Sequence, residues 1–294
     1  MAAEDVAMAR RMWTLFESYH SSTYFTPESR EATDELGCKG GWMGYFGMRA
    51  APLGAARPEL VRATFYNFHD SLVNRAIPDA WAVATPARYL EARLAGVDGA
   101  LRRILGDVLF GDELAEAADL AKQAARKAQT GGRPLGAANA ALPWPAEPHL
   151  ALWQAATVLR ESRGDGHVAA LVVAGLDPCE TIVTFAADTG LDPGYMRVAR
   201  GWSDQAWQDA ERRLTQRGLL AEDGKLTETG YRIRSTVERQ TDVQAAVPWL
   251  AIGPDRTARF AELITPIVLA VAEANDAMRL NLMALNLAEG RYPK

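Results

Sequence analysis

A glutamate and a histidine near the N-terminus have a spacing that both proton transfer and metal binding use. Glu17 and His20 lie three positions apart in a segment predicted to be helical, and side chains three apart share one face of a helix. Di-iron helical bundles use this spacing too, but they need a second such pair and further carboxylates, which we do not find in the sequence. We therefore predict no metal and no cofactor. The spacing makes Glu17 and His20 the candidate catalytic acid–base pair, and a satisfied polar pair in a helix interface is the alternative and the commoner arrangement.

Aromatic and polar side chains that suit a small-molecule site are concentrated in the same region. Arg49 shares a predicted helical face with three aromatic residues, and a guanidinium can hold a carboxylate, sulfate or phosphate through two parallel hydrogen bonds. The alternative is an ion pair of Arg49 with Glu17 or Asp70 inside the fold. The predicted substrate-binding residues are Tyr24, Trp42, Tyr45, Arg49, Asn67 and His69. Core packing is the alternative for the tyrosines and for His69.

The segment 40–54, GGWMGYFGMRAAPLG, places glycines along one side of a predicted helix, among them Gly44 and Gly47. Each glycine in a helix interior costs about 0.5–1 kcal/mol relative to alanine. Either close packing against a neighbouring helix or a ligand that approaches the backbone would offset this cost. Close packing is the commoner reason.

The segment 201–232 has the pattern of a winged helix. Its apolar residues fall on one helical stripe, which consists of Trp202, Ala206, Trp207, Ala210 and Leu214. Gly218 ends this helix, and Asp223-Gly224 is a strong signal for a hairpin turn between two short strands. The next helix begins near Tyr231.

These elements predict a mainly α fold with two domains. Residues 1–130 would form a helical domain that binds a small molecule, and 131–149 would be a linker because four prolines and three glycines interrupt any periodicity. Residues 150–294 would form a winged-helix domain with a small β wing and C-terminal helices. Within it, 150–160 and 166–175 are predicted as separate helices.

Composition limits the classes of protein and partner. Apolar residues make up 48% of the 294 residues and charged residues 23%, as in a globular protein. No run of about 18 uncharged apolar residues predicts a membrane span, and the N-terminus does not resemble a secretory signal. We therefore expect a cytoplasmic protein with reduced thiols at Cys38 and Cys179. The net charge of −5 disfavours a general polyanion binder.

At RAAPLG, TFYNF and TDVQAAVPWLAIG, and at the helix and hairpin of 201–232, the chain resembles a mainly actinobacterial family of uncharacterised proteins with a MarR-like winged-helix half. The matching segments span residues 10–105 and 150–270. Members are commonly labelled transcriptional regulators because of that domain, and some are expected near specialised-metabolite pathways. The family offers no established catalytic residues, so the resemblance implies a fold more than an activity.

Charge argues against DNA reading by the predicted winged helix. Residues 203–217 carry three acidic and three basic side chains, and the hairpin with its surroundings adds three acidic side chains and one lysine, whereas a DNA-reading surface needs cations. We therefore expect a small-molecule-binding protein, a cofactor-independent acid–base enzyme of specialised metabolism that keeps the winged helix as a scaffold. The alternative is a MarR-like, ligand-responsive regulator that binds DNA as a dimer. The sequence leaves open a homo-oligomer or a partner subunit.

Overall fold

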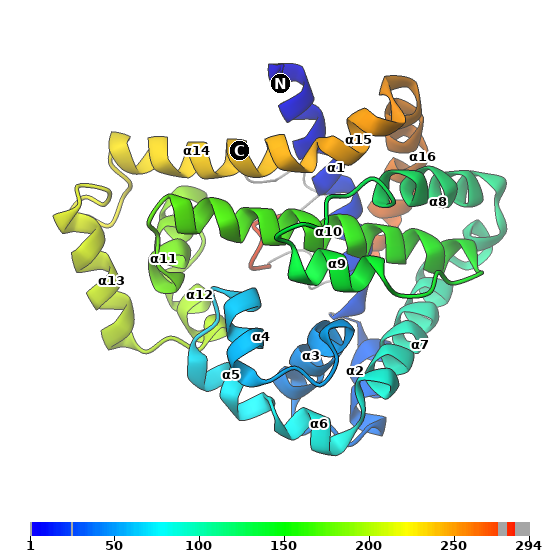
Figure 1. Ribbon diagram of the computed structural model, residues 1–294, viewed down its shortest axis with the longest axis horizontal. Coiled ribbons are helices and arrows are strands. Elements are labelled where there is room, and N and C mark those ends of the chain that lie inside the picture. The colour runs from blue at the N-terminus through cyan, green and yellow to red at the C-terminus, as the bar shows by residue number, and fades with distance from the viewer. Residues whose placement is uncertain (1, 25, 276–280, 286–294) are drawn as a thin grey trace.

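The computed structural model describes residues 2–24, 26–275 and 281–285. Helices dominate these residues (Figure 1). The elements before residue 130 are α1 (Ala3–His20), η1 (Ser21–Thr23), α2 (Pro27–Glu35), α3 (Gly41–Ala50), η2 (Ala51–Leu53), α4 (Pro58–Phe65), α5 (Asp70–Ala76), α6 (Asp79–Val83), α7 (Pro86–Leu105), η3 (Gly106–Phe110) and α8 (Asp112–Ala125). Those after it are α9 (Pro134–Ala140), α10 (Pro148–Val173), α11 (Pro178–Thr189), α12 (Pro193–Arg200), α13 (Asp204–Gln216), α14 (Glu228–Ala245), α15 (Val247–Ile252) and α16 (Pro254–Ala274).

Proline sets the start of many of these helices. Eight of the helices in the described part of the chain have proline as their first residue. Proline fits there because its fixed φ suits the first turn and its missing N–H would have no partner within the helix. The mainly α class predicted from the sequence is thus confirmed.

The largest buried cluster joins helices from both ends of the chain. Helix α1 packs against α10, α14 and α16, and α8 packs against α10 and α16. Large side chains such as Phe16, Trp153 and Phe260 fill this core. A second cluster lies among α3, α5 and α7, and a third joins α11, α13 and α14. Residues before 130 and after 150 therefore share one core.

The predicted linker contains helix α9, which packs closely on α10. Leu135 is buried, and a Cβ added at Gly136 would lie 2.8 Å from the Cα of Ser162. The N–H of Gly136 donates a hydrogen bond to Asp165 at 2.8 Å. These contacts hold 134–140 against the helix that follows it in the chain.

Helix α10 is continuous where the sequence predicted two helices. It runs through Gly164 and Gly166 without a break. At Gly166 an added Cβ would lie 2.3 Å from the guanidinium of Arg133, so close approach explains this glycine. The continuity matters because the charged residues 160–167 then all belong to one rigid helix.

The glycines of α3 confirm the prediction of close helix packing. A Cβ at Gly44 would lie 2.7 Å from Thr33 of α2, and one at Gly47 would lie 2.4 Å from the ring of Tyr89 on α7. Helix α3 can approach both neighbours only because these side chains are absent.

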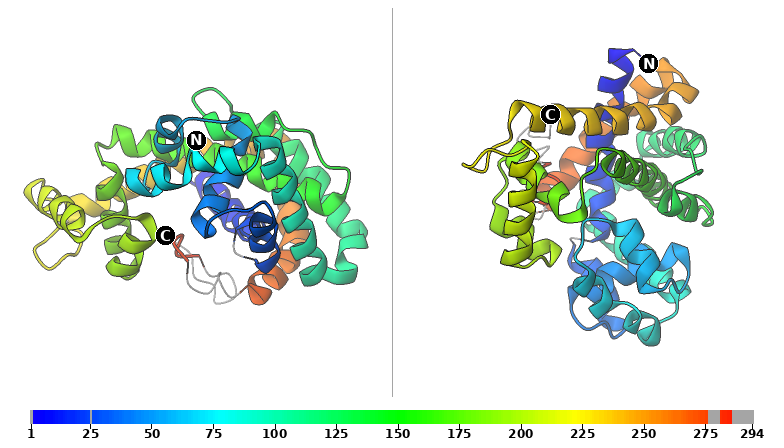
Figure 2. Two further views of the ribbon diagram at one scale, coloured as in Figure 1. Left: turned by 90° about the horizontal axis from the view of Figure 1, so that it is seen from below. Right: turned by 60° about the vertical axis from the view of Figure 1, so that its left-hand side comes forward.

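Helices α11, α12 and α13 lie together at one end of the long axis of the molecule, with the 219–227 hairpin beside them (Figures 1 and 2). We call α11–α13 the helix-turn-helix unit. The predicted β wing is reduced, in the described residues, to a single antiparallel bridge between Leu220 and Leu226. The turn at Asp223-Gly224 is present, but the paired segments are too short to count as strands. No single described helix is long and apolar enough to cross a membrane.

Candidate functional site

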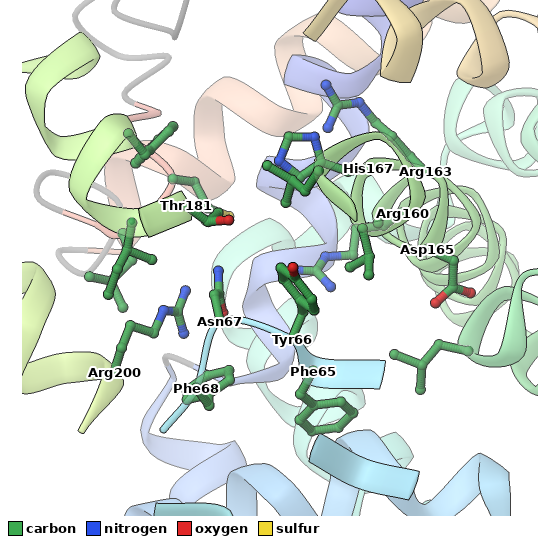
Figure 3. Close-up of a pocket in the computed structure, with 18 of the residues that line it drawn as sticks. Phe65, Tyr66, Asn67, Phe68, Arg160, Arg163, Asp165, His167, Thr181 and Arg200 are labelled. Carbon is green, nitrogen blue, oxygen red and sulfur yellow. The ribbon is translucent and has the colours of Figure 1, made fainter. Parts of the chain in front are cut away.

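A cavity of about 200 Å³ lies between the helix-turn-helix unit and the helices of the main core (Figure 3). Its walls come from α1, α3, α4, α10 and α14 on one side and from α11 and α12 on the other. Six arginines line it: Arg10, Arg49, Arg160, Arg163, Arg200 and Arg234. Apolar surface is contributed mainly by Phe65, Phe68, Leu171, Ile182, Phe185 and Met196. The cavity thus combines cationic groups with apolar walls.

Glu161 of α10 neutralises two of the arginines. It accepts two parallel hydrogen bonds from Arg49, both at 2.9 Å, and one from Arg160 at 3.0 Å. Burial alone would raise the pKa of Glu161, but the two guanidinium groups outweigh burial and hold its pKa far below the usual range. Arg160 also pairs with Glu17, at 3.4 Å.

A second network joins α1, α10 and α14. Arg10 donates to Glu238 at 2.6 Å and to Asp242 at 2.8 Å, and Arg163 contacts Asp242 at 3.1 Å. Arg234 donates to Glu238 at 2.9 Å. Burial would raise the pKa of Glu238, but the cationic groups around it lower that pKa. These ion pairs fix α14 against α1 beside the cavity.

Arg200, the last residue of α12, differs from the other five arginines. Its guanidinium makes no hydrogen bond or ion pair with any side chain of the described residues. Its Nε is buried without a partner, as are the Nε atoms of Arg163 and Arg234. It lies 4.3 Å above the ring of Phe68, and Figure 3 shows it pointing toward Asn67. Burial lowers the pKa of Arg200 to about 10, so it stays charged at neutral pH.

Two titratable groups of α10 that the sequence prediction missed also line the cavity. Asp165 is buried, and burial raises its pKa to about 6 although the N–H of Gly136 opposes the shift. His167 hydrogen-bonds Thr241 at 2.9 Å, and burial lowers its pKa to about 4. The Thr241 hydroxyl already donates to the carbonyl of Val237. It must therefore accept from His167, which places the imidazole proton on Nδ1.

The predicted catalytic residues Glu17 and His20 are both buried, but their polar atoms have different partners. Glu17 lines the cavity, where it accepts from Trp13 at 3.2 Å and pairs with Arg160. His20 bonds the hydroxyl of Thr157 at 3.1 Å and stacks on Trp153. Burial, reinforced by Arg160, lowers the pKa of His20 far below the usual range. His20 is not among the residues that line the cavity.

The structure brings several of the predicted binding residues together. Tyr24, Trp42 and Tyr45 form a chain of edge-to-face rings, with centroids 4.9 Å apart for the tyrosines and 5.6 Å for Trp42 and Tyr45. Tyr45 accepts from Arg49 at 3.0 Å. Of these four, only Tyr45 and Arg49 line the cavity. Arg49 has the internal ion pair that was the alternative at the sequence level, although its partner is Glu161.

Asn67 and His69 belong to a segment that grips the helix-turn-helix unit. We call residues Tyr66 to His69 the 66–69 segment. The backbone N–H of His69 donates to the carbonyl of Arg200 at 2.9 Å, and the indole of Trp202 donates to the carbonyl of Asn67 at 3.0 Å. The His69 ring packs on Trp202 and its Nδ1 accepts from Ser71, so His69 caps helix α5. Asn67 lines the cavity, whereas His69 does not.

The first residue of the 66–69 segment makes a further contact. Tyr66 has φ of 28°, a backbone conformation that residues with a Cβ rarely adopt. Its hydroxyl donates to the carbonyl of Leu176, between α10 and α11, at 2.6 Å. The segment is therefore bound to Leu176, just before α11, through its first residue and to Arg200, at the end of α12, through its last residue. Side chains of the segment also line the cavity.

Helix α13 presents little free positive charge. Arg213 pairs with Asp177 at 2.6 Å and with Glu180 at 3.1 Å, and Arg217 pairs with Glu180 at 2.8 Å. Arg212 pairs with Asp209 of the same helix. Each arginine that the sequence assigned to this helix is thus neutralised by a carboxylate. Among the residues described, no three His, Cys, Asp or Glu side chains converge as ligands of a metal ion would.

Three helices at one end of the molecule and a hairpin after the third define a helix-turn-helix protein. A family model described as a helix-turn-helix family matches residues 9–278. The chain belongs to this family. No curated protein and no solved structure matches it.

Proposed function

We propose that this protein binds a small organic anion in the arginine-lined cavity, and that the helix-turn-helix unit serves as one wall of that site. The observation that carries the proposal is the cavity itself, which combines buried guanidinium groups with apolar walls between two sets of helices. Ligand sites in proteins are typically concave, mainly apolar and supplied with a few well-placed polar groups.

Catalysis in this cavity would be of the acid–base kind. Glu17 is bound to Arg160 and to Trp13, and His20 does not line the cavity. Proton transfer by Glu17 and His20 would therefore need a substrate that displaces Arg160 or Trp13 from Glu17 and reaches His20. Asp165 is better suited as a proton acceptor, because it lines the cavity and its pKa of about 6 is near the working range of a general base. We propose Asp165 for this role within a cofactor-independent enzyme.

Filling the cavity should abolish binding. Gly164 lines it. Apart from its chain neighbours and the backbone of its own helix, an added Cβ there would have one atom of the described residues within 4 Å, an oxygen of Glu161 at 3.8 Å. Gly164→Phe should therefore project a ring into the cavity and remove the binding of 2-naphthoate, a flat organic anion, measured by isothermal titration calorimetry. Gly164→Ala is the matched control and should bind as the wild type does. Equal affinity of the phenylalanine variant would place the ligand elsewhere and end the proposal.

A ligand-responsive, MarR-like winged-helix regulator is the second candidate. The 66–69 segment favours it, because this segment lines the cavity and also contacts Leu176 just before α11 and Arg200 at the end of α12. A ligand that moved the segment would move the unit. The single bridge between Leu220 and Leu226 lies where a wing would be.

A DNA-binding experiment separates the two candidates. Because the arginines of α13 are paired with carboxylates, we expect no specific shift of the DNA upstream of the protein's own gene in a gel-shift assay at low and moderate salt. A specific complex with steep salt dependence would instead establish the regulator, and 2-naphthoate added to the same assay would show whether the cavity controls it.

A further inference from the structure

Arg200 is the cavity arginine that has no ion-pair partner among the described residues. The other five cavity arginines each pair with at least one carboxylate in the described structure, drawn from Glu17, Glu161, Asp188, Glu238 and Asp242. Asp165 does not supply the missing charge, because it accepts from the N–H of Gly136 and Figure 3 shows it across the cavity from Arg200. Arg200 therefore has no carboxylate partner in the part of the chain that the structure describes.

A partly buried cation without an ion-pair partner is unfavourable for folding. A charged group removed from water needs a partner of opposite charge or a full set of hydrogen bonds. Stacking on Phe68 offsets only part of the cost. Groups that are costly for stability in this way are concentrated at sites of function.

We propose that Arg200 anchors the charged group of the ligand, and that this ligand is a monoanion, a carboxylate on a flat apolar body. This inference rests on the proposed function and specifies the ligand class. The guanidinium fork matches a carboxylate in shape and hydrogen-bond geometry. Arg49, which the sequence analysis predicts as the group that binds an anion, already donates two parallel hydrogen bonds to Glu161.

Charge balance favours one negative charge over two. A carboxylate would place its single charge on Arg200, whereas a phosphate monoester would bring a second charge to face the carboxylates Glu17, Asp165 and Glu238 that also line the cavity. Like charges at short range in a medium of low polarity repel strongly. The side chain of Asn67 lies beside Arg200 and can add a neutral hydrogen bond (Figure 3).

The apolar walls indicate the body of the ligand. Phe65 and Phe68, with Ile182 and Phe185 of α11, belong to the apolar lining of the cavity. A lining that contains several aromatic rings favours an apolar, flat ligand body through apolar burial and contact with ring edges and faces. A planar aromatic or conjugated acid satisfies both the walls and Arg200.

The first test needs no ligand and measures thermal unfolding. Methionine replaces arginine with an apolar side chain of similar reach, so Arg200→Met should raise the Tm by about 2 °C or more by removing the charge that has no ion-pair partner. Arg197→Met, on the same helix but paired with Asp204, is the matched control and should not raise the Tm. A lower Tm for Arg200→Met would show that Arg200 serves the fold, and would overturn the proposal.

The second test compares three ligands that share one ring system, by isothermal titration calorimetry. The wild type should bind 2-naphthoate more tightly than 2-naphthyl phosphate and 2-naphthylmethanol. Arg200→Met should weaken the binding of 2-naphthoate at least about tenfold, and Arg197→Met should leave it unchanged.

The outcomes distinguish this inference from the proposed function. If all three compounds bind alike, and if binding responds to Gly164→Phe but not to Arg200→Met, the cavity is a ligand site and Arg200 is not its anchor. If the phosphate binds best, the ligand class is wrong. If none of the compounds binds the wild type, both the ligand class and the proposed function fail.

Discussion

Replacing Glu161 with glutamine should lower the free energy of unfolding by about 3–5 kcal/mol. The substitution keeps the size of the side chain but removes the charge that faces Arg49 and Arg160. Arg49 then remains buried without a carboxylate partner, and Arg160 keeps only Glu17, at 3.4 Å. Attraction to Glu161 is the interaction that outweighs the cost of burying these groups. Urea unfolding followed by circular dichroism would measure the change.

The matched control is Asp70→Asn, which removes a carboxylate from an ion pair of similar length but at the surface. Arg62 and Asp70 are 2.7 Å apart, and the Asp70 side chain is 64% exposed. Exposed pairs contribute about 0–1 kcal/mol, so this variant should unfold almost as the wild type does. Equal effects of the two substitutions would contradict the view that Glu161 is the electrostatic centre of the cavity.

Protonation of His167 should destabilise the protein as the pH falls. The pKa of His167 is about 4 in the folded state and ordinarily 6.5, so between these values the unfolded chain binds the proton more readily. The stability associated with the neutral imidazole is complete above pH 6.5 and is lost as the pH falls toward 4. The loss amounts to about 3 kcal/mol at pH 4, because one pKa unit corresponds to about 1.4 kcal/mol.

The comparison that isolates this effect is the wild type against His167→Gln, at pH 7.5 and at pH 4. Asp165 has a raised pKa and acts in the opposite direction over the same range, and His20 acts in the same direction as His167. Both contributions are shared by the two proteins and cancel in the difference. Glu238, Arg163 and the hydroxyl of Thr241 also face His167. A stability difference that does not change with pH would show that His167 is accessible to protons in the folded state.

The local signals in the sequence predicted most of the helices because their causes are local. Proline marks helix starts through its own ring, and Gly218 and Asp223-Gly224 mark the end of α13 and the turn that follows. The glycines of α3 predicted close packing, because glycine destabilises a helix and is tolerated where a neighbouring element or a ligand approaches the backbone. The length of the two strands of the wing was overestimated. A turn signal predicts where the chain reverses, but it does not determine how many residues pair on either side.

The site was less predictable, because its partners are distant in sequence. Glu161 lies 112 positions from Arg49, and no spacing rule connects them. The stretch 160–167, RESRGDGH, was divided because glycines usually weaken a helix, and this division concealed the charged residues that line the cavity. A usable signal was present: five charged or imidazole side chains within eight residues of an otherwise apolar helix are unusual unless they have buried partners.

The carbonyl of Arg200 is held by the 66–69 segment while its side chain faces the cavity, and the next residue begins the turn into α13. Arg200 would therefore both contact a bound ligand and precede the turn that positions α13. Coupling between the cavity and α13 would then need neither a chain of side chains across the core nor a large movement of helices. A rotation of the peptide group after Arg200 would change both the hydrogen bond to His69 and the start of the turn into α13.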